Sequence, residues 1–156
     1  MNPYILKNSL KKGLVTINIE IEKTGAELKK TVHAKFGRSF HIREVDTGSC
    51  NACESEIIAC SNPMYDIQRF GIDFVASPRH ADALLVTGPV SKNMLGPLKK
   101  TYEAMPGPKF VITCGDCALN AGCFKGSYYV EGAIKDILPV TLHIPGCPPS
   151  PLIIIQ

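Results

Sequence analysis

The sequence predicts an α/β protein with an open, mostly parallel sheet and helices on both of its faces. From residue 40 onward, short apolar runs alternate with helical stretches, which is typical of repeated strand–helix–strand units. The runs are almost continuously apolar, as expected of strands that are buried on both faces. The chain has 156 residues, 45% of them hydrophobic and 20% charged, which suffices for one domain with its own core.

The N-terminal part of the chain is basic and precedes this pattern. Residues 1–45 hold nine Lys or Arg and four Asp or Glu, whereas the remainder holds eight and ten. We therefore predict a basic N-terminal arm over residues 1–39 that faces a partner or a membrane, followed by an α/β domain over 40–156. Within the arm we expect three elements, which are a short basic amphipathic helix over 5–12, a strand over 15–22 and a helix over 24–36.

The strands and helices of the domain follow from apolar runs and their boundaries. The helix over 91–104 has Ser91 as its N-cap candidate and ends before Pro106, and a further helix is expected over 54–61. The strand candidates are residues 40–45, 71–76, 82–87, 109–113 and 139–144.

Composition excludes several classes of protein. No run reaches the roughly 18–20 apolar residues of a membrane span, and the N-terminus lacks the apolar core of a signal peptide. A reducing cytoplasm is therefore expected, and the odd count of seven cysteines argues against a disulfide scaffold. With no Trp and 7% aromatic residues, no basic and aromatic residues are interleaved, so we expect no nucleic-acid partner.

Four cysteines follow the ends of predicted strands. Cys50 and Cys53 come after the strand over 40–45, Cys117 after that over 109–113, and Cys147 after that over 139–144. Because parallel sheets place their sites in loops beyond the carboxyl ends of the strands, these thiols are expected at one edge.

Three kinds of site could use these thiols. A thioredoxin-like dithiol needs only Cys50 and Cys53, and leaves the others unexplained. A Cys₄ zinc site could join them to Cys114 and Cys117, but its two pairs usually lie 15–20 residues apart, far fewer than here. A [4Fe–4S] cluster accepts four thiolates from scattered loops rich in Gly and Pro, such as "TGSC", "GDC" and "PGCPP", and is the favoured interpretation.

The motifs carry a family resemblance over residues 45–151. "DTGSCNACESEI", "RFGIDFVASPRHADALLVTGPVS", "GDCALNAGCF" and "PVTLHIPGCPPSP" resemble the proximal-cluster small subunit of group 4 energy-converting [NiFe] hydrogenases and formate hydrogenlyases. That family is homologous to the 20 kDa subunit of complex I. Its complex I branch has adjacent cysteines at the first position, whereas the C-x-x-C of this chain is similar to the hydrogenase branch.

The resemblance implies a flavodoxin-like fold and one [4Fe–4S] cluster. Cys60, Cys114 and Cys123 are then left as small hydrophobic residues. Glu56 matches a carboxylate suspected of moving protons in the family, whereas Glu54 is expected to complement the helix dipole. The implied cluster ligands are Cys50, Cys53, Cys117 and Cys147.

The implied function is electron transfer within a membrane-associated [NiFe] hydrogenase-type complex, as a non-catalytic subunit of an oxidoreductase. The implied partners are a hydrogenase-type large subunit, a ferredoxin-like iron–sulfur subunit and membrane subunits, on the cytoplasmic side of the cell membrane. A complex I-like quinone or sulfur reductase is the alternative, and a Cys₄ zinc protein a further one. The family normally continues past "PGCPPSP" into a helix, which is expected to be absent or supplied differently here.

Overall fold

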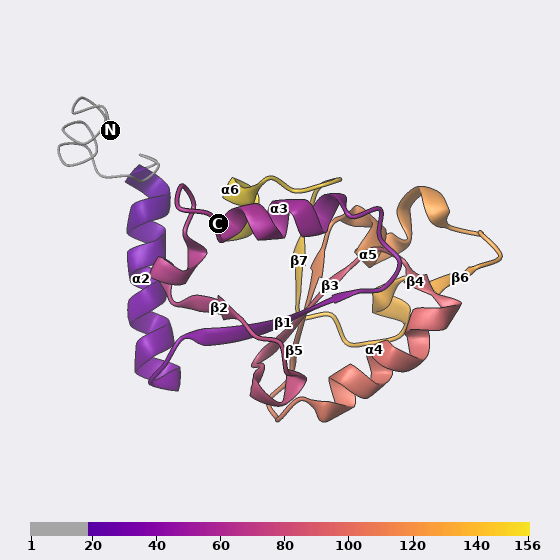
Figure 1. Ribbon diagram of the computed structural model, residues 1–156, viewed down its shortest axis with the longest axis horizontal. Coiled ribbons are helices and arrows are strands. Elements are labelled where there is room, and N and C mark those ends of the chain that lie inside the picture. The colour runs from indigo at the N-terminus through magenta and orange to yellow at the C-terminus, as the bar shows by residue number, and fades with distance from the viewer. Residues whose placement is uncertain (1–18) are drawn as a thin grey trace, which may run out of the picture.

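The computed structural model describes residues 19–156 (Figure 1). The helix expected over 5–12 and the first half of the strand expected over 15–22 lie outside these residues. No helix in the described part of the chain is both long and apolar enough to cross a membrane.

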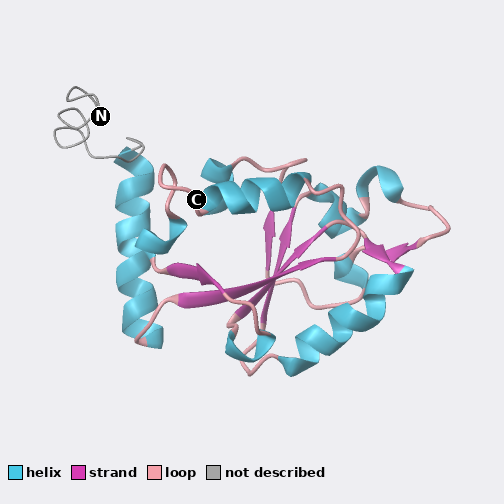
Figure 2. Ribbon diagram, viewed as in Figure 1, coloured by secondary structure: helices cyan, strands magenta, loops and turns pink. Residues whose placement is uncertain are grey.

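A five-stranded sheet forms the centre of the molecule (Figure 2). Its strands are β1 (Phe40–Asp46), β2 (Ile72–Phe74), β3 (Ala83–Thr87), β5 (Phe110–Cys114) and β7 (Leu142–Ile144). The spatial order is β2-β1-β3-β5-β7, and every neighbouring pair is parallel. Counted along the chain this is the order 2-1-3-4-5 of flavodoxin-like folds. The predicted fold class is confirmed.

Helices cover both faces of this sheet. The helices α3 (Ala52–Cys60) and α6 (Pro151–Ile155) pack on one face, and α4 (Lys92–Ala104) and α5 (Asp116–Asn120) pack on the other. A further helix, α2 (Ile19–Phe36), lies along the β2 edge, as Figure 1 shows. The short helix α6 follows the last cysteine motif, at the place where the longer helix of the family was expected to be absent or supplied differently.

The core reflects the alternation of side chains along the strands. Leu84 and Val86 of β3 point to the α4 side, where Leu98 is fully buried, whereas Leu85 points to the α3 side against Ile57. Complete burial of such aliphatic side chains contributes about 1.5–3 kcal/mol each. Because β3 is covered on both sides, all five of its residues are buried.

Smaller elements connect the main ones. A separate antiparallel pair, β4 (Val90–Ser91) and β6 (Val130–Gly132), was not foreseen from the sequence. The strands expected over 71–76 and 139–144 form, but only over three residues each. The 3₁₀ turns are η1 (Ile67–Phe70), η2 (Pro78–His80), η3 (Gly122–Phe124) and η4 (Ile134–Asp136).

The strand expected over 15–22 is wrong for residues 19–22, which belong to α2. The helix predicted over 24–36 extends toward the N-terminus, because adding a turn to an existing helix costs less than forming a strand without a neighbour. Tertiary contacts favour the extension. Glu22 forms an ion pair of 2.7 Å with Arg69, and Gly25 packs closely against the ring of Phe70.

Candidate metal centre

Four cysteines from three strand ends line one small pocket at the carboxyl edge of the sheet. Cys50 lies in the loop after β1, and Cys53 lies in the first turn of α3. Cys117 lies in α5 after β5, and Cys147 lies in the loop after β7. The four residues that the sequence singles out as ligands are therefore brought together.

The other three cysteines lie outside this pocket. Cys114 ends β5 and is fully buried in the core. Cys60 is also fully buried, and its thiol donates to the carbonyl of Glu56 at 3.2 Å. Burial raises the pKa of both thiols, that of Cys60 to about 12, so both are neutral at pH 7. Cys123 is exposed in η3.

Hydrogen bonds fix the loop that carries Cys50. The carboxylate of Asp46 accepts from the backbone N–H groups of Gly48 and Ser49 at 2.8 and 2.7 Å. The buried hydroxyl of Thr47 donates to the carbonyl of Thr87 at 2.8 Å, which ties this loop to the end of β3. These bonds start the turn from β1 into α3 at the switch point of the sheet.

A second set of bonds joins the loops of Cys117 and Cys147. The N–H of Asp116 donates to the carbonyl of Gly146 at 2.9 Å, and the N–H of Gly146 donates to the Asp116 carboxylate at 3.1 Å. This reciprocal pair holds the ends of β5 and β7 in register. The backbone that carries the thiols after both strands is thereby held by hydrogen bonds.

Glycines make room beside the sulfur atoms. Gly115 has a φ of +87°, and a Cβ there would lie 2.6 Å from the Sγ of Cys53. Gly122 has a φ of +49°, and a Cβ there would lie 2.8 Å from the Sγ of Cys117. Such close approach of backbone to a thiol is what a site built around its sulfur atoms requires.

Two of the four thiols, those of Cys53 and Cys117, are held in surroundings that disfavour their ionisation. Burial, followed by the charge of Glu54, raises the pKa of Cys53 to about 11. Burial, followed by the charge of Cys147, raises the pKa of Cys117. Thiolates grouped in this way need a positively charged centre to bind, because their mutual repulsion is otherwise uncompensated.

The donor set fits an iron–sulfur cluster. In the described part of the chain, no three His, Cys, Asp or Glu side chains converge as the ligands of a single metal ion do. The zinc alternative also needs Cys114, whose side chain is directed into the core. A [4Fe–4S] cluster binds one thiolate at each of its irons, and its ligands are therefore spread around the group.

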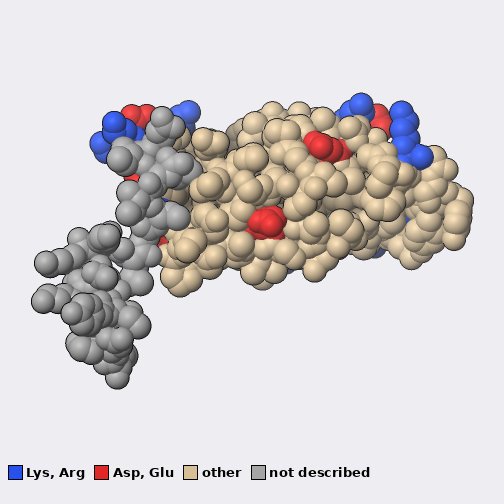
Figure 3. Space-filling model, turned by 90° about the horizontal axis from the view of Figure 1, so that it is seen from above, with Lys and Arg blue, Asp and Glu red and all other residues tan. Residues whose placement is uncertain are grey.

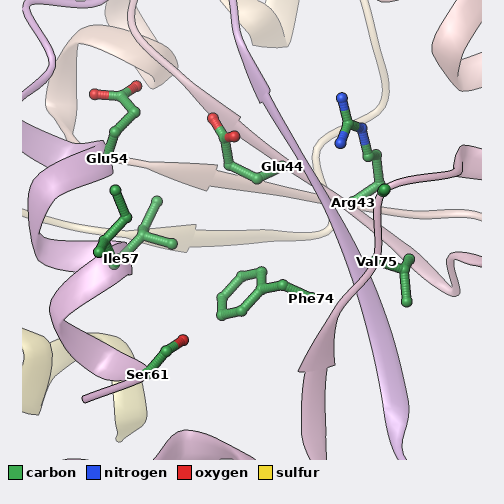
Figure 4. Close-up of a pocket in the computed structure, with 9 residues that line it drawn as sticks. Arg43, Glu44, Glu54, Ile57, Ser61, Phe74 and Val75 are labelled. Atoms are coloured by element: carbon green, nitrogen blue, oxygen red, sulfur yellow. The ribbon is translucent and has the colours of Figure 1, made fainter.

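Two carboxylates near the thiol pocket were not correctly described from the sequence, since Glu54 was expected to complement the helix dipole and Glu44 was not singled out. Both oxygens of Glu54 are buried without a hydrogen-bond partner, although a first-turn acid normally caps or faces solvent. Glu44 of β1 lies near it, and was missed from the sequence (Figure 4). Its signal was present, since Glu44 follows Phe40 and Ile42 at the inward-facing positions of the strand. Glu56 lines neither the thiol pocket nor the separate pocket that Glu44 and Glu54 line.

Comparison with known proteins identifies the family. Residues 50–156 match the family described as NADH ubiquinone oxidoreductase, 20 Kd subunit. The chain belongs to this family. The family resemblance inferred from the motifs is confirmed, and several relatives are named as subunits of oxidoreductase complexes.

Two of the curated relatives are named as subunits of hydrogenase-type complexes. Formate hydrogenlyase subunit 7 of Escherichia coli is 41% identical over 137 residues, which cover 88% of this chain and 54% of that protein. The probable membrane-bound hydrogenase subunit mbhJ of Pyrococcus furiosus is 46% identical over 131 residues, which cover 84% and 76%. The chain therefore spans about half the length of the first relative and three quarters of the second.

A solved structure also resembles the chain. It is that of a membrane-bound sulfane sulfur reductase, an archaeal respiratory membrane complex. One of its chains matches with a TM-score of 0.67 and 31% sequence identity, covering 81% of this chain and 70% of that chain. Family members thus occur in complexes of both kinds considered from the sequence.

Proposed function

We propose that this chain is the electron-transfer subunit of a membrane-associated [NiFe] hydrogenase-type complex, and that it holds one [4Fe–4S] cluster. The observation that carries the proposal is the convergence of thiols from three strand ends on one pocket that excludes Cys114. The proposed ligands are Cys50, Cys53, Cys117 and Cys147.

The bound cluster supplies reversible one-electron transfer. The chain's own residues position the ligands and limit access of water to them. Phe124, Pro89 and Pro148 line the pocket with apolar surface, and the glycine backbone at Gly115 and Gly122 leaves space for sulfur. Residues around such a cluster tune its potential through burial and hydrogen bonds to sulfur.

Partner subunits are proposed to cover the cluster edge and the adjoining face that carries α3 and α6. Seen from above the sheet, the face that carries α3 and α6 displays few charged side chains, and Lys and Arg gather at its two ends (Figure 3). Its exposed apolar residues include Ile58 of α3 and Leu152 and Ile153 of α6. A face of this composition suits a stable subunit interface. We propose that this face contacts the large subunit. We also propose a ferredoxin-like subunit and membrane subunits as partners.

A pair of substitutions tests the cluster assignment. Cys147→Ser should lose the cluster, whereas Cys114→Ser should keep it, because only the first changes a pocket thiol. Iron and acid-labile sulfide are measured in anaerobically purified protein, with about four of each per chain expected for the unaltered chain. The reverse pattern, or about one zinc without sulfide, would support the double C-x-x-C zinc site instead.

A second experiment tests assembly and location. The proposed place is the cytoplasmic side of the membrane, with the arm of residues 1–39 on a membrane module or on anionic lipid. The intact chain should co-purify with membranes, and deletion of residues 1–12 should weaken this association. An intact chain that elutes as a monomer from the soluble fraction, unaffected by the deletion, would contradict the assembly.

The sulfur or quinone reductase is the second candidate, favoured by the 31% identity to a chain of the sulfane sulfur reductase. The large subunit distinguishes the two, because a NiFe centre needs its own thiolates. Two C-x-x-C pairs in the co-purifying large subunit support the hydrogenase, and their absence supports the reductase.

A further inference from the structure

A second pocket, of about 440 Å³, opens between α3 and the edge of the sheet formed by β1 and β2. Its walls are largely apolar, and include Ile57 of α3 together with Phe74 and Val75 at the end of β2. Two carboxylates interrupt this apolar lining. Glu54 enters from α3 and Glu44 from β1, as Figure 4 shows. We call it the Glu44–Glu54 pocket.

Within residues 19–156, neither carboxylate in this pocket forms an ion pair. Both oxygens of Glu54 are buried and accept no hydrogen bond from any residue in the described part of the chain. Glu44 is half-buried and accepts one long bond, 3.5 Å, from the hydroxyl of Thr87. Burial and then the charge of Glu54 raise the pKa of Glu44, as expected of carboxylates that face each other in an apolar wall. An unpaired buried charge is unfavourable, so the pocket is suited to a positive group.

Arg43 does not fill this role. It lines the pocket, but in Figure 4 its guanidinium lies on the side of Glu44 that is opposite to Glu54. Among the ion pairs of residues 19–156, none joins Arg43 to either carboxylate. Among the described residues, the lining of the pocket holds one cationic side chain and two carboxyl groups, so carboxyl groups outnumber cations there.

The shape and lining of the pocket define the ligand chemistry. An apolar wall with carboxylates on it matches a side chain with an aliphatic stem and a cationic head. A guanidinium suits it better than an ammonium, since it presents a planar fork of N–H donors to carboxylates and is less strongly hydrated. Ile58 lines the pocket and is 72% exposed, so the pocket opens onto the apolar face proposed for the large subunit.

We propose that the Glu44–Glu54 pocket receives an arginine side chain of the large subunit, which neutralises both carboxylates when the subunits assemble. The inference rests on the proposed function, because it needs a partner on the α3 face. The pocket then makes docking selective, since the isolated chain carries an electrostatic cost that the correct partner removes.

The test compares the unfolding temperature of the chain with its affinity for the large subunit. If the two carboxylates had a purely structural role, removing their charges would lower both. In the double variant Glu44→Gln, Glu54→Gln, the isolated cluster-loaded chain should unfold at a higher temperature than the unaltered chain. Its affinity for the large subunit, measured by biolayer interferometry under anaerobic conditions, should fall by at least about 30-fold. Glu103→Gln, an exposed carboxylate of α4 on the opposite face of the sheet, is the control and should leave this affinity unchanged.

A small probe tests the ligand chemistry separately. n-Butylguanidinium should raise the unfolding temperature of the isolated loaded chain but not that of the double variant, and its neutral analogue n-butylurea should raise neither. Equal stabilisation by sodium or potassium would assign the pocket to a free cation and overturn the proposal. If Arg43→Gln loses as much affinity for the large subunit as the double variant does, the two carboxylates pair with Arg43 of this chain rather than with an arginine of the partner. That result would also overturn the proposal.

The outcomes also separate this inference from the proposed function. A chain that holds no cluster and associates with no partner overturns both. A loaded chain that binds the large subunit, with the double variant binding equally well, overturns the arginine pocket and leaves the proposed function intact.

Discussion

Replacing Gly115 by alanine tests whether the backbone at the end of β5 is shaped around a sulfur atom. The residue has φ +87° and ψ 150°, a conformation that residues with a side chain rarely adopt. Holding alanine there costs about 1–3 kcal/mol, which for a domain of this size lowers the unfolding temperature by about 2–12 °C.

The added methyl group also collides with a predicted ligand. Its Cβ would lie 2.6 Å from the Sγ of Cys53, whereas ordinary contact begins at 3.4 Å. The sulfur or the backbone must therefore yield by about 0.8 Å. Cluster ligation depends on the position of each sulfur, so Gly115→Ala should lose most of its iron and sulfide in addition to the loss of stability.

Gly126→Ala separates these two effects. Gly126 also has a positive φ, +84°, but a Cβ there would meet nothing within 4 Å. It should lose stability through backbone strain and keep the cluster. The assay is iron and sulfide content after anaerobic reconstitution, together with thermal unfolding of both apo-variants. A Gly115→Ala protein that binds the cluster as fully as Gly126→Ala would refute the argument that Gly115 serves Cys53.

Two further predictions concern the rest of the fold. Asp82→Asn should destabilise the chain by about 1 kcal/mol at pH 7, because it removes a carboxylate that is stabilised in the folded state. Burial by itself would raise the pKa of Asp82. Hydrogen bonds from Arg38, at 2.8 and 2.9 Å, and from the N–H of His41 outweigh burial and lower this pKa. Because the pKa of Asp82 is lowered by folding, its carboxylate stabilises the chain at pH values above the ordinary pKa of 3.8. Urea unfolding at several pH values should therefore show that the difference in stability between the unaltered chain and Asp82→Asn vanishes as the pH falls below 3.8 and Asp82 becomes protonated. Leu98→Ala should cost about 2–5 kcal/mol, measured by the same unfolding, since Leu98 is fully buried between α4 and the sheet. A cost below 1 kcal/mol would mean that this part of the core collapses to fill the cavity.

Much of the site could be predicted from local pattern. Alternating strands and helices imply a parallel sheet, and parallel strands bring their carboxyl ends to one edge. Cys50, Cys53, Cys117 and Cys147 each follow a strand, so their meeting required no knowledge of side-chain contacts. The spacing of Cys114 and Cys117 left a zinc site open, however, because a C-x-x-C motif does not say which thiol faces the core.

Other features depended on contacts between distant segments. The helical form of residues 19–22 is supported by the ion pair between Glu22 and Arg69, which are far apart in the chain. An alternating pattern such as that of residues 15–22 favours a strand only if a neighbouring strand is available to pair with it.

The sequence by itself determined the class of fold, the edge of the sheet where the thiols gather and the family, because these depend on periodicity and motif order. The tertiary structure decided which way each side chain points. Register along β5 turns Cys114 inward, and the packing of α3 on β1 sets Glu54 beside Glu44 in an apolar wall. These relations are absent from local spacing because they arise only when separate elements pack together, and burial then fixes the charge that each group can carry.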